Sequence, residues 1–287
     1  ARNQALARSL EAAVRPGDVV VDLGAGSGLL ALVAARQGAR KVYAIERSSM
    51  ATVARRLVAQ NGYEQVIEVV QADSFDWQPP ERAQVLISET LGFAVFDEQF
   101  RACMADARER MLVAGGRIIP ERIDVYAAPV SPVAHVPDIG HMDEILGFDF
   151  SPLARMFRGA HQRAYVPEED LLAPPRMLCS VDCRTMAMEA ELYAEAVFEC
   201  RRAGVLAGFA LWFVADMGAG ITMSSRSPDP EDNHWGQALL GAGERGFVEP
   251  GQAIRLALGM VDHRRSFRLE WSHALLAGAA AGLVPSP

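Results

Sequence analysis

The stretch VVVDLGAGSGLL, Val19 to Leu30, constrains the fold more than any other part of the sequence. Its apolar residues predict a strand, its three glycines a tight turn, and the residues from Ser27 onward a helix. Glycines at 24, 26 and 28 let the backbone turn sharply and approach a ligand without Cβ atoms in the way. A strand that enters a helix through such a turn is typical of parallel α/β sheets.

The first 120 residues repeat this alternation of short apolar runs and helical patterns. Ser48 or Ser49 is a suitable cap for the second helix, and Gly115-Gly116 is expected to stop the last one. The βαβα order predicts a doubly wound, Rossmann-like parallel sheet in a domain spanning 1–120. The expected strands are 18–22, 41–45, 66–70, 85–88 and one that starts at 117–119, and the expected helices are 27–37, 49–61 and 97–112.

The pattern changes after Ile119-Pro120-Glu121, because strands then follow strands with turn signals between them. This order predicts an antiparallel sandwich or barrel for residues 121–287, and we favour a β-barrel. The Ala/Gly-rich tail after Leu276 is expected to fray. The expected strands are 122–130, 176–184, 193–202, 204–217, 236–240, 253–262 and 266–275.

An insertion at about 131–163 interrupts the strand-rich half. Helical stretches are expected near Met142–Leu146 and Leu153–Phe157. An apolar helix in this position needs a partner surface. We therefore expect a helical dimerisation arm that docks on the first domain of a second copy, which makes the protein a homodimer. The apolar residues at near-helical spacing are Ile139, Met142, Ile145, Leu146 and Phe148.

Charge and composition narrow the possible partners. The formal net charge of −8 makes the chain a poor general binder of nucleic acid. No apolar run reaches the roughly 18 residues of a membrane span, and no signal peptide is visible, so we expect a cytoplasmic protein that does not bind membranes. The four cysteines lack CxxC spacing, which favours buried reduced thiols over disulfides or a metal site.

Acidic residues follow the predicted strands where a nucleoside cofactor would lie. The turn has G-x-G-x-G spacing with Leu29 where a dinucleotide fingerprint has glycine, and Asp22 just ahead of it would repel a pyrophosphate. Glu46 ends the second strand and can accept hydrogen bonds from both ribose hydroxyls, and Asp73-Ser74 follows the third strand near an adenine edge. These features favour S-adenosylmethionine over NAD, although such turns also occur simply for packing.

A second motif, SETLGFAVFDE, places Glu89 and Glu98 nine residues apart on one apolar loop. Burying two carboxylates in apolar surroundings is costly unless a cation compensates them. Two carboxylates can hold a planar guanidinium by forked hydrogen bonds and orient one nitrogen towards a methyl donor. The alternative is that Glu98 is merely an exposed first-turn residue of the 97–112 helix.

Several motifs together resemble the protein arginine methyltransferases, and the chain is similar to a bacterial-type member of that family. The order and spacing of the motifs match over nearly the whole chain. The matching segments are VVDLGAGSG, YAIE, ISETLGFAVFDE, GGRIIP and NHWGQ at 233–237, and Gly147–Ser151 looks like the end of the family's dimerisation arm.

The resemblance implies roles for individual residues. Glu89 and Glu98 would be the catalytic double-glutamate pair. His234 would border the guanidinium pocket and help to take up the proton, and Trp235 would wall the pocket. Arg2 would bind the cofactor carboxylate. For His234 a structural turn histidine stays the alternative.

The chain departs from the family pattern at several positions. Leu6 stands where an aromatic residue is usual, and Thr90 and Leu91 replace bulkier residues. The acidic residue that pairs with the family's histidine is expected before residue 1. These departures leave the choice of acceptor and the degree of methylation open.

The expected activity is S-adenosylmethionine-dependent N-methylation of an arginine guanidinium in a protein or peptide, without a metal. The Ala- and Arg-rich composition favours a bacterial source of high GC content, where free arginine or a small guanidine-bearing metabolite is an alternative acceptor. A non-catalytic scaffold with the same fold is a third interpretation, and failure to bind S-adenosylmethionine would favour it.

Overall fold

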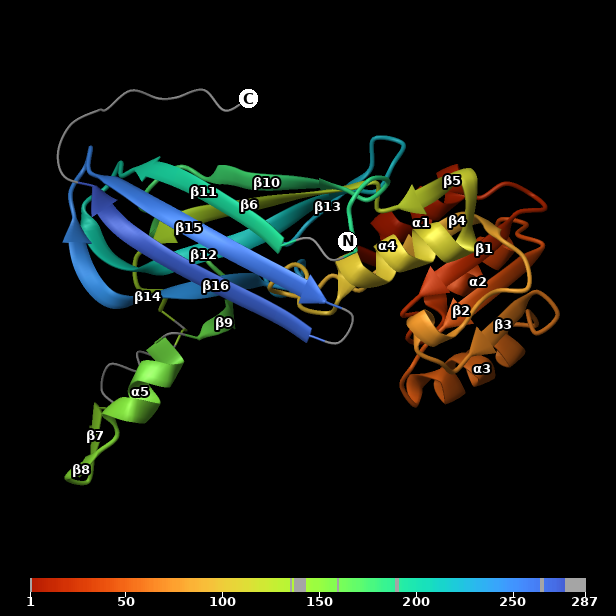
Figure 1. Cartoon of the computed structure of the whole chain (residues 1–287), viewed down its shortest axis with the longest axis horizontal. Coiled ribbons are helices and arrows are strands. Elements are labelled where there is room, and N and C mark those ends of the chain that lie inside the picture. The colour runs from red at the N-terminus through yellow and green to blue at the C-terminus, as the bar shows by residue number, and fades with distance from the viewer. Residues whose placement is uncertain are drawn as a thin grey trace.

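The computed structural model describes residues 2–134, 136, 143–158, 160–188, 191–263 and 266–276. A parallel sheet and its helices make up one half of the molecule, and antiparallel sheets make up the other (Figure 1). The change from one to the other occurs where β5 (Leu112–Ile119) is followed by β6 (Arg122–Val130).

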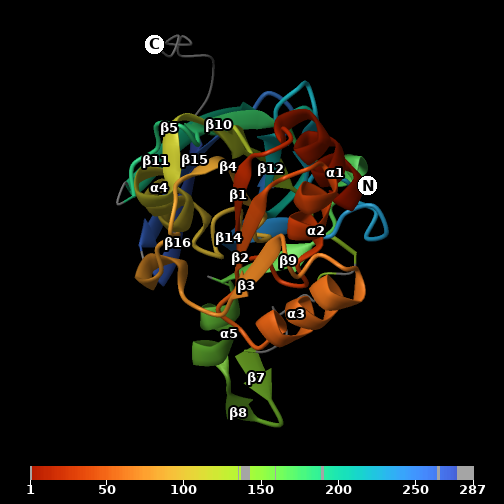
Figure 2. The same ribbon diagram turned by 90° about the vertical axis from the view of Figure 1, so that its right-hand side faces the viewer.

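The predicted doubly wound sheet is confirmed, with strand order β3-β2-β1-β4-β5 and parallel pairing throughout. Figure 2 shows α1, α2 and α3 on one face of this sheet and α4 on the other. The central strand β1 is buried at every position, as expected for a strand covered on both faces. The remaining elements are α1 (Arg2–Ala13), β1 (Val19–Leu23), α2 (Leu29–Arg36), β2 (Lys41–Ile45), α3 (Met50–Gln60), β3 (Ile67–Val70), β4 (Ala83–Ser88) and α4 (Phe100–Met111).

The second half is antiparallel, as predicted. Its hydrogen-bonded ladders join β10-β6-β12-β14-β9 in one sheet, with β13 paired to β12, and β11-β15-β16 in another. The strands β9 and β13 had no counterpart in the sequence prediction. The strands are β9 (His161–Ala164), β10 (Arg176–Asp182), β11 (Glu191–Glu199), β12 (Gly204–Asp216), β13 (Thr222–Ser224), β14 (Gln237–Val248), β15 (Ala253–His263) and β16 (Ser266–Leu276).

A continuous hydrophobic core runs through both halves. In β12, Phe209, Leu211 and Phe213 face the main core, while Ala210 and Trp212 face a smaller cluster on the opposite side. Helix α1 reaches across to the second half, where the Ser9 hydroxyl donates to the carbonyl of Met217. The two halves therefore pack as one body around the loops that leave β1 and β4.

The helix predicted over 97–112 begins and ends elsewhere. Helix α4 starts at Phe100, because the chain still turns at Val95 and Gln99, where φ is 70° and 64°. Strand β5 follows directly at Leu112, and Gly115 lies in an irregularity of its pairing with β4 rather than at a helix end. Glu98 thus lies before the helix, and the interpretation of Glu98 as a first-turn residue is wrong.

The arm is a hairpin followed by a helix. Strands β7 (Glu144–Ile145) and β8 (Phe148–Asp149) pair through a two-residue turn at Leu146-Gly147, where φ is 53° and 83°, the geometry of a tight hairpin. The helix expected near Met142–Leu146 is therefore wrong for the residues that the structure describes, and Ile139 and Met142 lie outside them. Helix α5 (Ser151–Arg158) confirms the second helical stretch.

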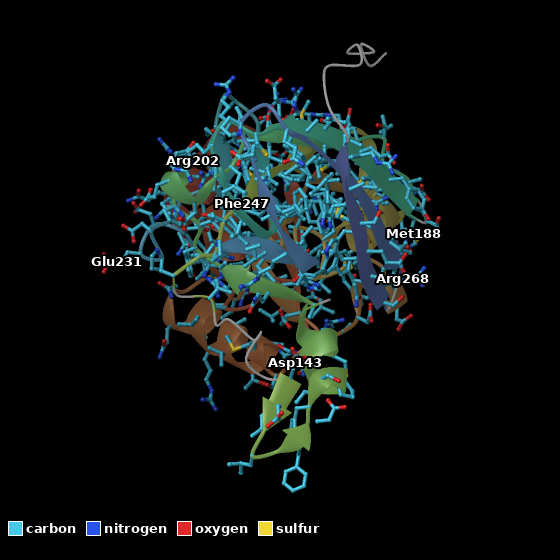
Figure 3. All side chains as sticks on the ribbon, turned by 90° about the vertical axis from the view of Figure 1, so that its left-hand side faces the viewer. Asp143, Met188, Arg202, Glu231, Phe247 and Arg268 are labelled. Atoms are coloured by element: carbon cyan, nitrogen blue, oxygen red, sulfur yellow. The ribbon has the colours of Figure 1, made fainter. Side chains whose placement is uncertain are left out.

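This arm projects away from both halves of the molecule (Figure 1). Figure 3 shows its hairpin and helix below the antiparallel sheets, near the labelled Asp143. Leu146 is 92% exposed and Phe148 68% exposed at its tip. Over the described part of the chain, no helix has the length and apolar character needed to cross a membrane.

Candidate active site

Two loops leave the parallel sheet side by side at the point where its strand order reverses. Leu23, the last residue of β1, pairs with Ser88, the last residue of β4. The Ser88 hydroxyl also donates to the Leu23 carbonyl at 3.1 Å. Ligands of open α/β sheets bind at such a switch point. The glycine turn and the glutamate loop therefore border one site.

The glycine turn requires its glycines for two reasons. Gly24, Gly26 and Gly28 all have positive φ, at 68°, 54° and 80°. A Cβ on Gly24 would come within 2.4 Å of a methyl group of Thr90 in the glutamate loop. The close approach of the two loops therefore depends on the absence of a side chain at residue 24.

Glu46 holds the shape of this turn. Its two carboxylate oxygens accept hydrogen bonds from the amides of Gly26 at 2.9 Å and Ser48 at 2.7 Å. Burial alone would raise the pKa of Glu46, but these bonds lower it below its ordinary range. Glu46 is therefore ionised and lies beside the turn, where its oxygens can accept further hydrogen bonds from hydroxyl groups.

Asp22 is buried ahead of the turn without compensation. Neither of its carboxylate oxygens accepts a well-formed hydrogen bond from any residue that the structure describes. Burial raises the pKa of Asp22 to about 7, and the charge of Glu46 adds to the rise. An unsatisfied acid in this position fits a ligand that brings a hydrogen-bond donor or a positive charge.

Asp73 and Ser74 follow β3 at the same edge of the sheet. The Asp73 carboxylate accepts from the amide of Phe75 at 3.0 Å and so starts a 3₁₀ turn. Arg110 fixes this segment from α4, because it donates to the carbonyls of Ser74 at 2.7 Å and Trp77 at 2.8 Å. The sequence prediction missed this role of Arg110, because contacts to main-chain carbonyls leave no motif.

In the glutamate loop, Glu89 already holds a guanidinium. Arg2 of α1 forms an ion pair with one Glu89 oxygen, and the guanidinium carbon of Arg2 lies 5.4 Å from the ring centre of Trp235. The Glu89 side chain is only 9% exposed, and its other oxygen has no donor among the described residues. Glu89 and Trp235 thus offer a carboxylate and an aromatic ring to a guanidinium.

Glu98 lies in the same loop, and the residue as a whole is exposed to solvent. Partial burial and the neighbouring Asp97 raise the pKa of Glu98, while the positive charges of Arg2 and Arg47 oppose the rise. Burial lowers the pKa of Arg2, and Glu98 opposes that shift. The loop therefore brings Glu89 and Glu98 to the same cation.

His234 and Trp235 reach this loop from the second half of the molecule. The indole nitrogen of Trp235 donates to the carbonyl of Leu91 at 2.7 Å. Partial burial lowers the pKa of His234, and the charges of Arg2 and Arg163 lower it further. A neutral imidazole at the edge of the pocket can accept a proton.

Two further residues shape the turn that carries His234, and the sequence prediction missed both. Asn233 is fully buried, and its side-chain oxygen accepts from the amides of Trp235 and Gly236 at 3.1 Å each. Arg163 on β9 donates to the His234 carbonyl and, at 2.7 Å, to the hydroxyl of Tyr165. The position of Asn233 directly before the His-Trp pair could have indicated its role. Arg163 could not have been identified, because it lies far from His234 in the sequence.

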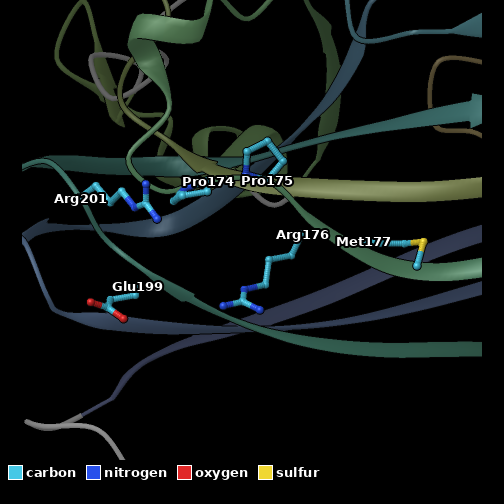
Figure 4. Close-up of a pocket in the computed structure, with 6 residues that line it drawn as sticks. All are labelled: Pro174, Pro175, Arg176, Met177, Glu199 and Arg201. Carbon is cyan, nitrogen blue, oxygen red and sulfur yellow. The ribbon is translucent and has the colours of Figure 1, made fainter. Parts of the chain in front are cut away.

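The four cysteines are free thiols that are buried or half-buried. Burial raises the pKa of Cys179 and Cys183 to about 12. Within the described residues, no group of three or more potential ligands could hold a metal ion. A cavity of about 410 Å³ lies elsewhere, beside β10 and β11, and none of the predicted site residues lines it (Figure 4).

Comparison with protein families matches each half of the chain separately. A family described as "Arginine methyltransferase oligomerization subdomain" matches residues 121–274. A family described as "Ribosomal protein L11 methyltransferase (PrmA)" matches residues 4–119.

Individual relatives cover most of the chain. Protein arginine N-methyltransferase 6 of Xenopus tropicalis is 31% identical over 83% of this chain and 73% of its own length. Probable histone-arginine methyltransferase CARM1 of Oryza sativa subsp. indica is 33% identical over 86% of this chain and 49% of its own length.

Two solved structures share the fold. The Trypanosoma brucei PRMT1 enzyme-prozyme heterotetrameric complex with AdoHcy superimposes with a TM-score of 0.83 at 20% identity, covering 95% of this chain and 94% of its own. The structure of Arabidopsis thaliana protein arginine methyltransferase 10 superimposes with a TM-score of 0.76 at 22% identity, covering 96% of this chain and 94% of its own.

Proposed function

This chain belongs to the protein arginine N-methyltransferase family, and we propose that it transfers the methyl group of S-adenosylmethionine to a guanidinium nitrogen of protein arginine. The observation that carries this proposal is the pocket around Glu89. Glu89 already holds the guanidinium of Arg2, which lies against Trp235, and its second carboxylate oxygen accepts from no donor among the described residues.

The residues around the glycine turn fit the cofactor. Asp22 offers an unsatisfied buried carboxylate, and Glu46 an ionised one, beside a turn whose glycines leave room for a ligand. Gly24, Gly26 and Gly28 would line the cofactor, Glu46 would hold its ribose, and Asp73 and Ser74 would border its base. Arg2 would bind its carboxylate, and to do so it would turn away from Glu89. S-adenosylmethionine, when bound, supplies an electrophilic methyl group on a sulfonium.

The acceptor side of the reaction follows from charge. Glu89 and Glu98 would hold two edges of the planar guanidinium, whose pKa is too high for it to lose its proton unaided. Their negative charge would favour positive charge on the nitrogens they bind and leave electron density on the third nitrogen, which would be the one that accepts the methyl group. His234, held neutral, would help to take up the proton that the methylated nitrogen releases.

The assembly we propose is a homodimer built through the arm. The exposed apolar residues of the arm need a partner surface. Leu29, Met50 and Val53 are exposed apolar residues on α2 and α3, the helices that cover one face of the parallel sheet. We propose that the arm of one copy, with Leu146 and Phe148 at its tip, packs on this helical surface of the other.

The acceptor can be tested directly against its alternatives. Incubation with isotopically labelled S-adenosylmethionine should label an arginine/glycine-rich peptide well above free arginine. Labelling of free arginine alone would indicate a small-molecule methyltransferase. Absence of S-adenosylmethionine binding by calorimetry would contradict the proposal and favour a scaffold.

A further inference from the structure

Arg163 on β9 lies along the turn that carries His234 and Trp235. Its Nη2 donates to the carbonyl of His234 and, at 2.7 Å, to the hydroxyl of Tyr165. A Cβ on Gly236 would come within 3.1 Å of the Arg163 Cγ and 3.2 Å of its Nε. The side chain of Arg163 therefore runs past Gly236 towards His234, and the end that carries the positive charge lies at His234.

Through His234, this guanidinium borders the proposed acceptor site. The rings of His234 and Trp235 have their centres 5.7 Å apart, and Trp235 lies against the guanidinium of Arg2, which pairs with Glu89. Burial lowers the pKa of His234, and the charges of Arg2 and Arg163 lower it further. Arg163 therefore lies within electrostatic reach of the imidazole and does not act on the main chain alone.

The guanidinium of Arg163 is held by neutral groups and still offers hydrogen-bond donors. Its carbon lies 5.4 Å from the ring centre of Tyr165. No described carboxylate forms an ion pair with Arg163, and its Nε and Nη1 donate to no described residue. The side chain is exposed. A guanidinium presents its donors as a planar fork that matches a carboxylate, and one that is already fixed loses less freedom on binding.

The charges around the proposed acceptor site are therefore of both signs. Glu89 and Glu98 suit a guanidinium, and Arg163 suits an anion next to it. The formal net charge of −8 disfavours anionic ligands at long range. A carboxylate on the acceptor would be attracted only where a local cation such as Arg163 faces it.

We propose that Arg163 selects acceptors by binding a carboxylate close to the guanidinium that is methylated. The proposal rests on the proposed function and names its substrate class: a peptide with an acidic side chain near the target arginine. The α-carboxylate of free arginine offers the same chemistry, and the test separates these two sources.

The test uses capped peptides with one target arginine and one glutamate, placed one or two residues before or after it. Each peptide has a partner with glutamine in place of glutamate, which keeps the shape and removes the charge. The ratio of kcat/KM within each pair measures the preference. At the position that reaches Arg163, we expect the wild type to prefer glutamate by roughly 2- to 10-fold, typical of a partly exposed charge pair.

The variant Arg163→Gln removes the charge and should bring this ratio to 1 or below. Loss of the contact with the His234 carbonyl would lower kcat/KM for both peptides of a pair alike and would not move their ratio. Arg163→Lys should retain part of the preference, because it keeps the charge without the fork. Arg202→Gln, at an exposed arginine labelled in Figure 3, is the matched control and should keep the wild-type ratio.

The outcomes separate the role of Arg163 from the proposed function. If the peptides are methylated but no wild-type ratio exceeds 1, or Arg163→Gln leaves the ratio unchanged, the role of Arg163 is overturned and the proposed function stands. An equal loss of preference in Arg202→Gln would assign the preference to long-range charge and also overturn that role.

A comparison of free arginine with argininamide, which lacks the carboxylate, tests the second source. Methylation of free arginine and of no peptide, with a preference over argininamide that Arg163→Gln removes, would keep the role of Arg163 and overturn the protein acceptor. Methylation of none of these compounds by the wild type would overturn both proposals.

Discussion

At the scale of single residues, the site consists of carboxylates whose surroundings differ. Glu46 accepts hydrogen bonds from two backbone amides. Asp22 accepts no well-formed hydrogen bond from the described residues. Glu89 pairs with Arg2 through one oxygen, and its other oxygen has no donor among the described residues. These differences give each carboxylate its own predicted response to mutation and to pH.

For the glutamate pair we expect coupled losses. Glu89→Gln and Glu98→Gln each keep the shape of the side chain but leave a buried guanidinium half-neutralised, which costs about 3–5 kcal/mol. Steady-state kinetics should show a loss in kcat/KM of roughly 10²- to 10³-fold for each, and less than the sum for the double variant. Cofactor affinity should hardly change, and Glu64→Gln on the exposed surface is the control. Small additive losses would contradict the guanidinium clamp.

For Glu46 we expect a loss of cofactor affinity. Glu46→Ala removes a charge-assisted bond pair worth roughly 1.5–3 kcal/mol, which corresponds to a 10- to 150-fold weaker Kd. Calorimetry with S-adenosylmethionine measures this Kd. Because Glu46 also holds Gly26 and Ser48, Glu46→Gln should retain part of the affinity. Unchanged affinity in the Ala variant would rule out the ribose assignment.

Asp22 predicts a pH dependence of stability. Its folded pKa of about 7 lies above the ordinary value of 3.8, so the folded state binds the proton more tightly and loses stability as pH rises between these values. Denaturant unfolding without cofactor measures the free energy of unfolding of the wild type and of Asp22→Asn at each pH. The variant's free energy of unfolding should rise relative to that of the wild type by roughly 2–3 kcal/mol between pH 5 and pH 8. A pH-independent difference would show that Asp22 is already compensated.

At the scale of elements, the glutamate loop depends on a bond from the other half of the chain. Trp235→Phe keeps an aromatic ring and removes the donor to Leu91, which leaves a buried carbonyl unpaired at a cost of about 1–3 kcal/mol. We expect lower stability by that amount and a clear loss of kcat/KM with unchanged cofactor affinity. Trp212→Phe, a buried ring outside the site, controls for lost packing. Equal effects on kcat/KM in both variants would contradict the tether.

The same scale shows what the sequence could predict. Strands of the parallel sheet were predictable because they are short apolar runs ended by turn residues, and strand β2 matches its expected range of 41–45. The start of helix α4 was predicted three residues too early, because positive φ angles at Val95 and Gln99, which non-glycine residues rarely adopt, leave no signal in the sequence. The hairpin β7–β8 was missed because its turn has Leu, not Asn or Asp, before Gly.

Part of the candidate site could also be predicted from the sequence, and part could not. Acids and glycines that follow strands could be identified, because parallel strands bring their carboxyl ends to one edge. Three arginine contacts could not be predicted, because each joins residues from 33 to 87 positions apart. They are the ion pair of Arg2 with Glu89 and the hydrogen bonds of Arg110 and Arg163 to main-chain carbonyls.

At the scale of the whole molecule, the arm predicts the oligomeric state. Leu146→Asn, which suits the positive φ at that position, combined with Phe148→Ser should remove the apolar contact and give monomers with reduced activity. Light scattering at micromolar concentration measures the mass, and Met50→Glu with Val53→Glu should act alike from the opposite surface. If the intact protein is already a monomer under these conditions, the arm has another role.

The bond between Trp235 and Leu91 also sets the order in which activity can arise during synthesis. The two residues are 144 positions apart, which a ribosome covers in roughly 7–29 s. Until Trp235 has left the ribosome, a nascent chain can carry the glycine turn and both glutamates without the wall that completes the acceptor pocket. The acceptor side of the site would therefore be completed only after Trp235 has been synthesised, so any methylation would begin late in the synthesis of the chain.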